Sequence, residues 1–190
     1  MSKFIREQLQ VQTKEWLLER LFEFSADDDI NSDRILLYLA AEKNDDLEVI
    51  KDFKSALDKA VEEVKVHGLA TWNDPLPLGG LDNIADALAK VSVNGKHSVV
   101  LEISEYALLG LDLISELQDE CELDYLIDAF RHLHLSACYN LKPDPEHFGI
   151  HLAELANKSE WGYFDGPPDG YTEVLGQAGL SSYASALKIK

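Results

Sequence analysis

The sequence predicts an all-α protein: stacked antiparallel helical hairpins, as a short α-solenoid or an irregular bundle, closed by a small C-terminal helical cap. Apolar residues recur at helical spacing along most of the chain, and strand-like alternation is nearly absent. Short segments rich in Pro, Gly, Asn or Asp separate the apolar stripes, and such short connections make consecutive helices antiparallel neighbours. With 190 residues, 46% of them hydrophobic, the chain fits one domain, residues 1–190, with a substantial core.

Residues 1–68 are expected to form the N-terminal helices. Thr13 is a candidate N-cap for the first helix, whose apolar face carries Trp16, Leu17, Leu21 and Phe24. Ser32 is expected to open a second helix, with the inward-facing residues Ile35, Leu36, Leu39 and Ala40. Asp45 or Asp46 caps a third helix that ends at Gly68. The buried stripe of this third helix is Leu47, Ile50, Phe53, Leu57, Ala60, Val61 and Val64.

A loop is expected over residues 69–80, because two prolines and two glycines in LATWNDPLPLGG disfavour a regular helix. Central helices follow over residues 81–158. The first of them runs from Leu81 to a stop at Asn94–Gly95. The next runs from about residue 97 to 117, with the stripe Tyr106, Ala107, Gly110, Leu113, Ile114 and Leu117. A glycine inside a helix is costly, so Gly110 predicts a close helix crossing.

The last two central helices meet at Pro143–Asp144–Pro145, where proline ends one helix and starts the next. The earlier of the two carries the stripe Leu123, Leu126, Ile127, Phe130, Leu133, Ala137, Cys138 and Leu141. Residues 159–190 form the cap, in which Gly176 separates two short helices. Such short helices need a preformed apolar surface, and burial beneath the cap is expected for Trp161, Tyr163 and Phe164.

The formal net charge is −18, from 35 acidic and 17 basic residues. Between Lys96 and Arg131 no Lys or Arg occurs, which leaves a strongly acidic segment over residues 102–128. This field repels phosphate backbones and disfavours direct nucleic-acid binding. Two interpretations stay open: the acidic face only keeps the protein soluble, or it docks a basic partner protein. The candidate contacts for such a partner are Glu105, Asp112, Glu116, Asp119 and Glu120.

A reduced, cytoplasmic protein is the simplest expectation for the compartment. Cys121 and Cys138 are too few for a disulfide framework, and no signal peptide precedes the first helix. No apolar run is long enough for a membrane span.

Four stretches carry a family resemblance: ERLFEFSADDDINSDRILLYLA, SVVLEISEYALLGLDLI, LHLSACYNLKPDP and YTEVLGQAGLSSYASAL. Each is similar to a segment of the helical region beside the zinc-binding domain of bacterial SWIM zinc-finger proteins, in the order that family uses. This chain departs from the family in one respect, since it lacks the Cys-x-Cys and Cys-x-His pairs of the zinc finger. The resemblance implies a helical companion region standing alone, with a role in scaffolding or protein contact and no catalytic residue to transfer.

One cluster of residues has metal-binding character. His147 and His151 are four residues apart and share a helix face, and Cys138 and His134 lie on the preceding helix. However, Cys138 falls on the apolar stripe, where a free cysteine behaves as a small hydrophobic residue. His132 and His134 also face different sides of their helix. Structural or surface histidines are the favoured interpretation, so no metal and no cofactor are expected.

The chain carries no nucleophile elbow, phosphate-binding glycine loop or dinucleotide fingerprint, so no enzyme activity is expected. Trp72, an aromatic among polar and proline residues, is either a partner contact or a local plug over the helices. The leading hypothesis is a non-enzymatic helical module that binds another protein. The second is an acidic inhibitor or nucleic-acid mimic that blocks a basic groove, and the third is a metal-binding protein.

Overall fold

The computed structural model describes residues 13, 16, 29–67, 78–115, 120–164 and 170–188. Within these residues the chain forms seven α-helices and no β-strand. The helices are α3 (Asp29–Ala41), α4 (Asp46–His67), α5 (Leu78–Val93), α6 (His97–Asp112), α7 (Glu120–Leu141), α8 (Pro145–Lys158) and α9 (Tyr171–Ala186). The predicted all-α fold is confirmed.

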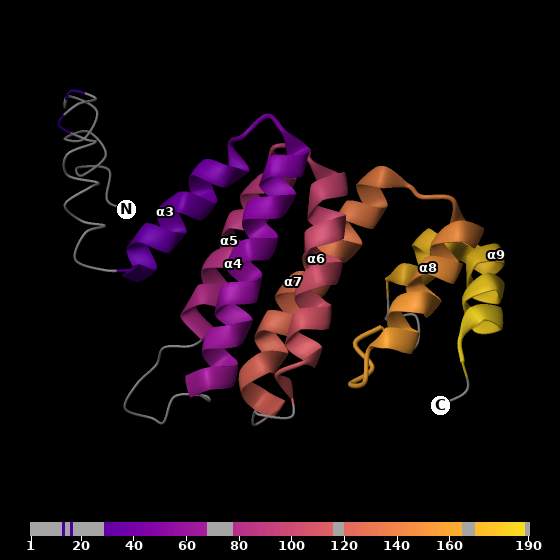
Figure 1. Ribbon diagram of the computed structural model, residues 1–190. Helices are drawn as coiled ribbons and strands as arrows, with labels where there is room; N and C mark the ends of the chain where they lie inside the picture. The colour runs from indigo at the N-terminus through magenta and orange to yellow at the C-terminus, as the bar shows by residue number, and fades with distance from the viewer. Residues whose placement is uncertain are drawn as a thin grey trace.

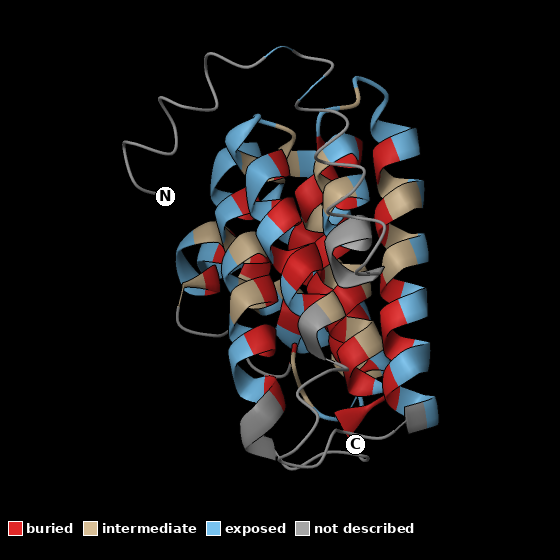
Figure 2. Ribbon diagram, turned by 90° about the vertical axis from the view of Figure 1, so that its left-hand side faces the viewer, coloured by how far each residue is buried: buried red, intermediate tan, exposed pale blue. Residues whose placement is uncertain are grey.

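Helices α3 to α7 lie side by side, and α8 and α9 form a pair at the other end of the molecule (Figure 1). Each of α3, α4 and α5 contacts both the next helix and the one after it, and α6 packs along α7. Buried side chains lie on the faces that these helices turn toward one another (Figure 2). The core therefore extends through the row of helices, with α5 in contact with α3, α4, α6 and α7.

Three predicted helix boundaries are confirmed by their capping contacts. The Asp45 carboxylate accepts hydrogen bonds from the backbone N–H groups of Leu47 (2.9 Å) and Glu48 (3.3 Å) and so caps α4. Asp144 caps α8 in the same way, through the backbone N–H of His147 at 3.0 Å. Gly95 ends α5 with a φ of 79°, a left-handed conformation that glycine adopts without strain.

Helix α3 corrects the predicted second helix in both its start and its inward face. It begins at Asp29 rather than at Ser32. Leu36 and Leu39 were expected inside, but they are 62% and 61% exposed, and the buried residues are Leu37, Ala40 and Ala41. Both sets fit helical spacing, and they differ by a rotation of about 100°, one residue. The helix therefore has apolar side chains on two sides, and only one side meets α4 and α5.

Other residues predicted in the core are exposed as well. Leu47, in the first turn of α4, is 77% exposed, and the buried stripe of that helix starts at Val49. Helix α6 ends at Asp112 instead of continuing to residue 117, and Leu113 is 63% exposed. Gly110 faces α4 as predicted, but a Cβ atom there would lie 3.4 Å from Val61 Cγ2, an ordinary contact distance, so the packing at this position does not require a glycine.

The C-terminal segment agrees with its prediction except at one aromatic residue. Gly176 has φ 55° and ψ −169°, which breaks α9 into two helical pieces. A Cβ atom on Gly149 of α8 would overlap the carbonyl oxygen of Gly179, so two glycines let α8 and α9 cross closely. Phe164 is buried as expected, whereas Trp161 is 41% exposed and lies outside the core. The predicted loop over residues 69–80 is also too long, because α5 begins at Leu78.

Candidate functional site

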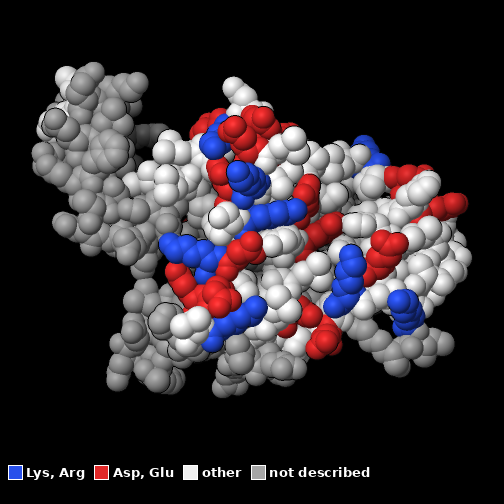
Figure 3. Space-filling model, viewed as in Figure 1, with Lys and Arg blue, Asp and Glu red and all other residues white. Residues whose placement is uncertain are grey.

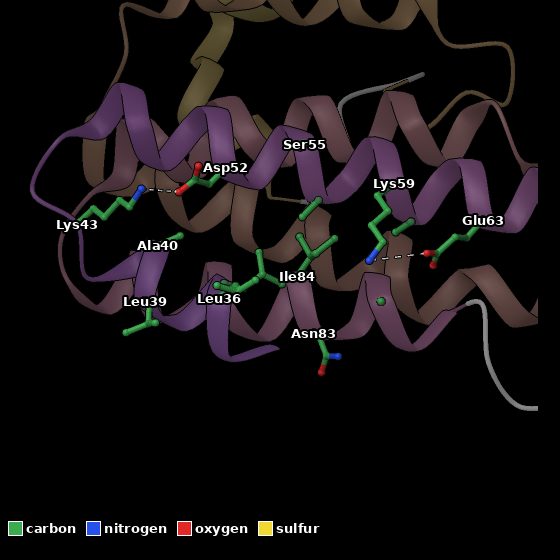
Figure 4. Close-up of a pocket in the computed structure, with 14 residues that line it drawn as sticks. Leu36, Leu39, Ala40, Lys43, Asp52, Ser55, Lys59, Glu63, Asn83 and Ile84 are labelled. Atoms are coloured by element: carbon green, nitrogen blue, oxygen red, sulfur yellow. Dashed lines mark hydrogen bonds and ion pairs between the residues drawn. The ribbon is translucent and has the colours of Figure 1, made fainter. Parts of the chain in front are cut away.

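An apolar groove of about 530 Å³ lies between α3, α4 and α5 (Figure 4). We call it the α3 groove. It is lined by Leu36, Leu37, Leu39, Ala40, Lys43, Asp52, Ser55, Ala56, Lys59, Ala60, Glu63, Gly80, Asn83 and Ile84. Leu36 and Leu39 of α3 stand on one side of it with most of their surface in solvent.

Small residues on the three helices explain why this surface is hollowed. Ala40, Ala56 and Ala60 offer only methyl groups where larger side chains would fill the space. A Cβ atom on Gly80 would lie 3.4 Å from the Cβ of Ala60, so α5 approaches α4 closely at this point. Small side chains therefore form the floor of the groove, and leucine side chains stand at its edge.

The charged residues at the groove pair with one another. Lys43 Nζ lies 2.8 Å from Asp52 Oδ2, and Lys59 Nζ lies 4.0 Å from Glu63 Oε1 (Figure 4). These two lysines and two carboxylates leave the groove without a net charge. The main chemical feature of the groove is therefore its apolar surface rather than a net charge of either sign.

A second candidate is a buried polar cluster formed by Glu105, His134, Cys138, His151 and Tyr171, which we call the Glu105 cluster. Its residues come from four helices: α6, α7, α8 and α9. The two imidazoles donate Nε2–H to one carboxylate oxygen, Glu105 Oε1, from His134 at 3.2 Å and from His151 at 2.8 Å. The Nδ1 of His134 accepts a hydrogen bond from the Tyr171 hydroxyl. One tautomer of His134, with the proton on Nε2, satisfies both of its nitrogens.

Burial and hydrogen bonding set the protonation of the Glu105 cluster. Burial alone would raise the pKa of Glu105, but the hydrogen bonds from His134 and His151 outweigh it and lower that pKa to about 2. The hydrogen bond between His151 and Glu105 raises the pKa of His151, although burial acts in the opposite direction. Burial also raises the pKa of Tyr171 and, together with the charge of Glu105, that of the Cys138 thiol to about 12. The cluster thus holds an ionised carboxylate and a protonated thiol.

The histidines of the predicted metal-binding cluster make separate contacts. Among the residues that the structure describes, no group of three or more His, Cys, Asp or Glu side chains is arranged to hold a metal ion. His134 and His151 aim at the Glu105 carboxylate instead of at a shared empty position. His147 lies apart from them, because its side chain is 90% exposed and its Nδ1 donates to Asp144 at 2.8 Å.

Cys138, His134 and Glu105 lie next to one another in space, which places an imidazole between a thiol and a carboxylate. The Cys138 Sγ lies 3.9 Å from His134 Nδ1, but that nitrogen already accepts from Tyr171. Cys138 and His134 are both 0% exposed, and Phe148 and Phe164 lie beside the imidazole, with ring centroids 6.2 Å and 6.4 Å away. A thiol with a raised pKa and no access to solvent is not an available nucleophile.

Two of the predicted acidic contacts, Glu105 and Asp112, are buried rather than exposed on a face. Glu105 is 14% exposed within its cluster, and Asp112 is 8% exposed. Asp112 accepts hydrogen bonds from Ser159 Oγ (2.7 Å) and from two backbone N–H groups of the segment after α8. Both carboxylates therefore hold helices together, which corrects the expectation that they bind a partner. Trp72, Glu116, Asp119 and the Glu120 side chain lie outside the described residues.

Charge on the face formed by α4 and α6 is mixed rather than uniformly acidic. Lys and Arg lie among Asp and Glu over these helices (Figure 3). Lys54 of α4 pairs with Glu102 of α6 at 2.7 Å. Glu102 belongs to the acidic segment of the sequence, and a lysine distant in sequence offsets it in the fold.

Sequence reasoning missed the α3 groove because it placed Leu36 and Leu39 in the core. A signal was present: α3 has apolar residues at nearly every position of RILLYLAA, so no single face holds them all.

Comparisons of the chain with protein-family models, curated proteins and solved structures gave no match. The resemblance to the SWIM-associated helical region therefore stays a prediction. In the part of the chain that the structure describes, none of the helices combines the length and the apolar character needed to cross a bilayer.

Proposed function

We propose that this protein is a non-enzymatic interaction module that binds an amphipathic helix of a partner protein in the α3 groove. The observation that carries the proposal is the exposure of Leu36 and Leu39, at 62% and 61%, beside an apolar depression. Contiguous apolar surface of this kind marks interaction sites in soluble proteins. The unpaired, buried Cys138 supports a reducing, cytoplasmic setting for this role.

The shape and charge of the groove favour a helix as the occupant. The groove lies along α3, which has 13 residues and is therefore about 20 Å long. A helix laid in a groove between other helices contacts it through residues at i, i+3, i+4 and i+7. Because the groove charges pair with one another, the fitting helix has an apolar stripe and polar residues of both signs.

The two leucines set the size of the expected contact energy. Burying a leucine side chain completely contributes about 1.5–3 kcal/mol. With roughly three-fifths of each side chain exposed, covering Leu36 and Leu39 contributes about 2–4 kcal/mol together. This corresponds to a change of about 30- to 700-fold in the dissociation constant.

A titration with a helical probe peptide tests the proposal. The probe is a fluorescein-labelled amphipathic peptide with leucines at i, i+3, i+4 and i+7 and with Glu and Lys at the other positions. Fluorescence anisotropy measures its binding to the full chain, to the double variant Leu36→Asp/Leu39→Asp and to Leu47→Asp. Leu47 is the matched control, since it is an exposed leucine outside the groove. The groove variant is expected to bind at least about 30-fold more weakly, and the control is expected to bind like wild type.

Two outcomes of this titration contradict the proposal. One is binding that Leu36→Asp/Leu39→Asp leaves unchanged, which would place the contact elsewhere. The other is equally tight binding of a probe with the same composition but a scrambled stripe. Steep loss of binding between low and moderate ionic strength would favour an acidic inhibitor or nucleic-acid mimic instead, because an apolar contact depends little on salt.

A further inference from the structure

We propose that the side-chain amide of Asn83 makes the α3 groove selective for a partner helix that carries one Asn or Gln in its apolar stripe. The inference rests on the proposed function and names the chemistry of its partner helix more closely. Asn83 belongs to α5 and lines the α3 groove (Figure 4). Of the described polar residues that line the groove, it is the one that is buried, at 8% exposed.

The amide of Asn83 has no hydrogen-bond partner in the part of the chain that the structure describes. Asn157, by contrast, uses both ends of its amide, which donates to the Ala186 carbonyl at 3.2 Å and accepts from the Lys188 backbone N–H at 2.8 Å. An amide side chain carries two N–H donors and one carbonyl acceptor. Because most buried polar groups in proteins are paired, the unpaired amide at the groove indicates a ligand that pairs with it.

The partner helix decides whether the Asn83 amide is paired once the groove is filled. A helix in the groove excludes water from the residues that line it. If the stripe of that helix is wholly apolar, the amide stays buried without a partner, which weakens binding by about 5- to 100-fold. One Asn or Gln at the matching turn of the stripe avoids this loss. Sites built around a buried polar group reject ligands without the complementary group for the same reason.

The groove favours an amide over a charged side chain as the complement of Asn83. Two facing amides each supply a donor and an acceptor, so they satisfy one another without adding charge. The two lysines of the groove already pair with Asp52 and Glu63. A charge on the apolar stripe of the partner would therefore be buried beside a neutral amide without a counter-ion, which is costly.

The position of Asn83 among apolar residues also fixes how the partner helix is placed. Gly80 and Ile84, three residues before it and one residue after it, line the same groove. A single polar position in an otherwise apolar helix contact sets the register of the two helices, at a cost in affinity. Asn83 is therefore expected to determine where along α3 the partner helix lies, as well as which helix binds.

Fluorescence anisotropy with a set of probe peptides tests this inference on the full chain. The all-leucine helical probe is compared with four asparagine probes, in each of which one leucine of the stripe is replaced by asparagine. Each probe is titrated against wild type, Asn83→Leu and Asn140→Leu. Leucine has nearly the shape of asparagine but no hydrogen-bonding group. Asn140 is the matched control, since it is exposed, lies outside the groove and donates within its own helix to Ser136.

The inference predicts opposite effects of Asn83→Leu on the two kinds of probe. In wild type, one asparagine probe should bind at least about 5-fold more tightly than the other three. Asn83→Leu should remove this advantage and should tighten the all-leucine probe at least about 5-fold, whereas Asn140→Leu should change neither. A general loss of folding would weaken all probes alike, so the opposite signs identify a contact with Asn83.

Nitrogen-15 NMR spectra give a second measurement on the same chain. The side-chain NH₂ signals of Asn83 are assigned by their absence in Asn83→Leu. Their hydrogen exchange should be slower with the matching asparagine probe than with the all-leucine probe, because a hydrogen-bonded amide is protected.

The outcomes separate the inference from the proposed function. Equal binding of the four asparagine probes by wild type, or the same change for every probe in Asn83→Leu, overturns the inference. The proposed function then still stands if Leu36→Asp/Leu39→Asp weakens the all-leucine probe. Probe binding that Leu36→Asp/Leu39→Asp leaves unchanged overturns both, because the probes are then bound outside the α3 groove.

Discussion

Replacing Glu105 by glutamine tests how the α8–α9 pair is attached to the other helices. Glutamine keeps the shape of the protonated acid and removes the charge. The Glu105 carboxylate accepts hydrogen bonds from His134 of α7 and His151 of α8, and His134 in turn accepts from Tyr171 of α9. The substitution therefore weakens a contact that joins four helices.

The lowered pKa of Glu105 gives the size of the expected loss in the free energy of unfolding. Its usual value of 4.5 falls to about 2 in the folded protein. Since each pH unit corresponds to about 1.4 kcal/mol, the ionised carboxylate contributes about 3 kcal/mol to the free energy of unfolding. For a chain of this length, that loss lowers the melting temperature by about 6–12 °C.

The pKa shifts of Glu105 and His151 predict how the stability of the protein changes at low and at high pH. A lowered glutamate pKa gives stability that is complete above about pH 4.5 and is lost as the pH falls toward 2. The raised pKa of His151 gives stability that is complete below its unfolded value of about 6.5 and is lost as the pH rises through the folded value. The hydrogen bond between His151 and Glu105 contributes to both pKa shifts, and His134 contributes to that of Glu105 as well, so the effect of Glu105→Gln is expected to be largest between about pH 4.5 and 6.5.

Urea denaturation at several pH values measures this effect. The matched control is Glu102→Gln, one turn away on α6, whose side chain is 49% exposed and pairs with Lys54. An exposed pair contributes about 0–1 kcal/mol, so this control should change stability little. A loss below about 1 kcal/mol for Glu105→Gln at pH 6, or a loss that stays constant down to pH 2, would refute the reasoning.

Three further predictions concern individual contacts. Gly149→Ala places a methyl group against the Gly179 carbonyl and should lower the free energy of unfolding, measured in urea, by about 1–3 kcal/mol. The control Gln177→Ala, on exposed surface, should change it by less than about 0.5 kcal/mol, and equal effects of the two substitutions would contradict the close helix crossing. Asp112→Ala leaves three hydrogen-bond donors without their acceptor and should lower the free energy of unfolding by about 2–3 kcal/mol. The control Asp86→Ala, at an exposed position, should lower it less. If Asp112→Ala has no effect, other contacts hold the segment after α8. Cys138 should react with iodoacetamide at pH 8 no faster than the protein unfolds, and rapid modification would mean that its thiol is accessible and its pKa is not raised.

The features predicted correctly from the sequence depend on local chemistry. Asp45, Asp144 and Gly95 act within a few residues of their own positions. Their roles as helix caps and as a left-handed glycine can therefore be recognised in the sequence without knowledge of the fold. The break at Gly176 is local in the same sense. The helical spacing of apolar residues was sufficient to predict the fold class.

The features predicted wrongly depend on contacts distant in sequence. Spacing alone does not decide which of two apolar sides of α3 meets α4 and α5, and so Leu36 and Leu39 were placed inside. Glu105 was counted as surface charge, although its partners His134 and His151 lie on other helices, 29 and 46 residues later. A composition rule that expects acids at the surface does not detect a carboxylate with two histidine donors.

Photo-crosslinking from position 36 tests most directly whether the exposed side of α3 holds a helix. A benzophenone amino acid is placed at Leu36 in the purified full chain and, as a control, at Leu47. With the helical probe peptide in excess, we expect adducts with the probe from position 36 and none from position 47, because only Leu36 lines the groove. If position 36 forms no more adducts with the probe than position 47 does, the α3 groove is not a helix-binding surface.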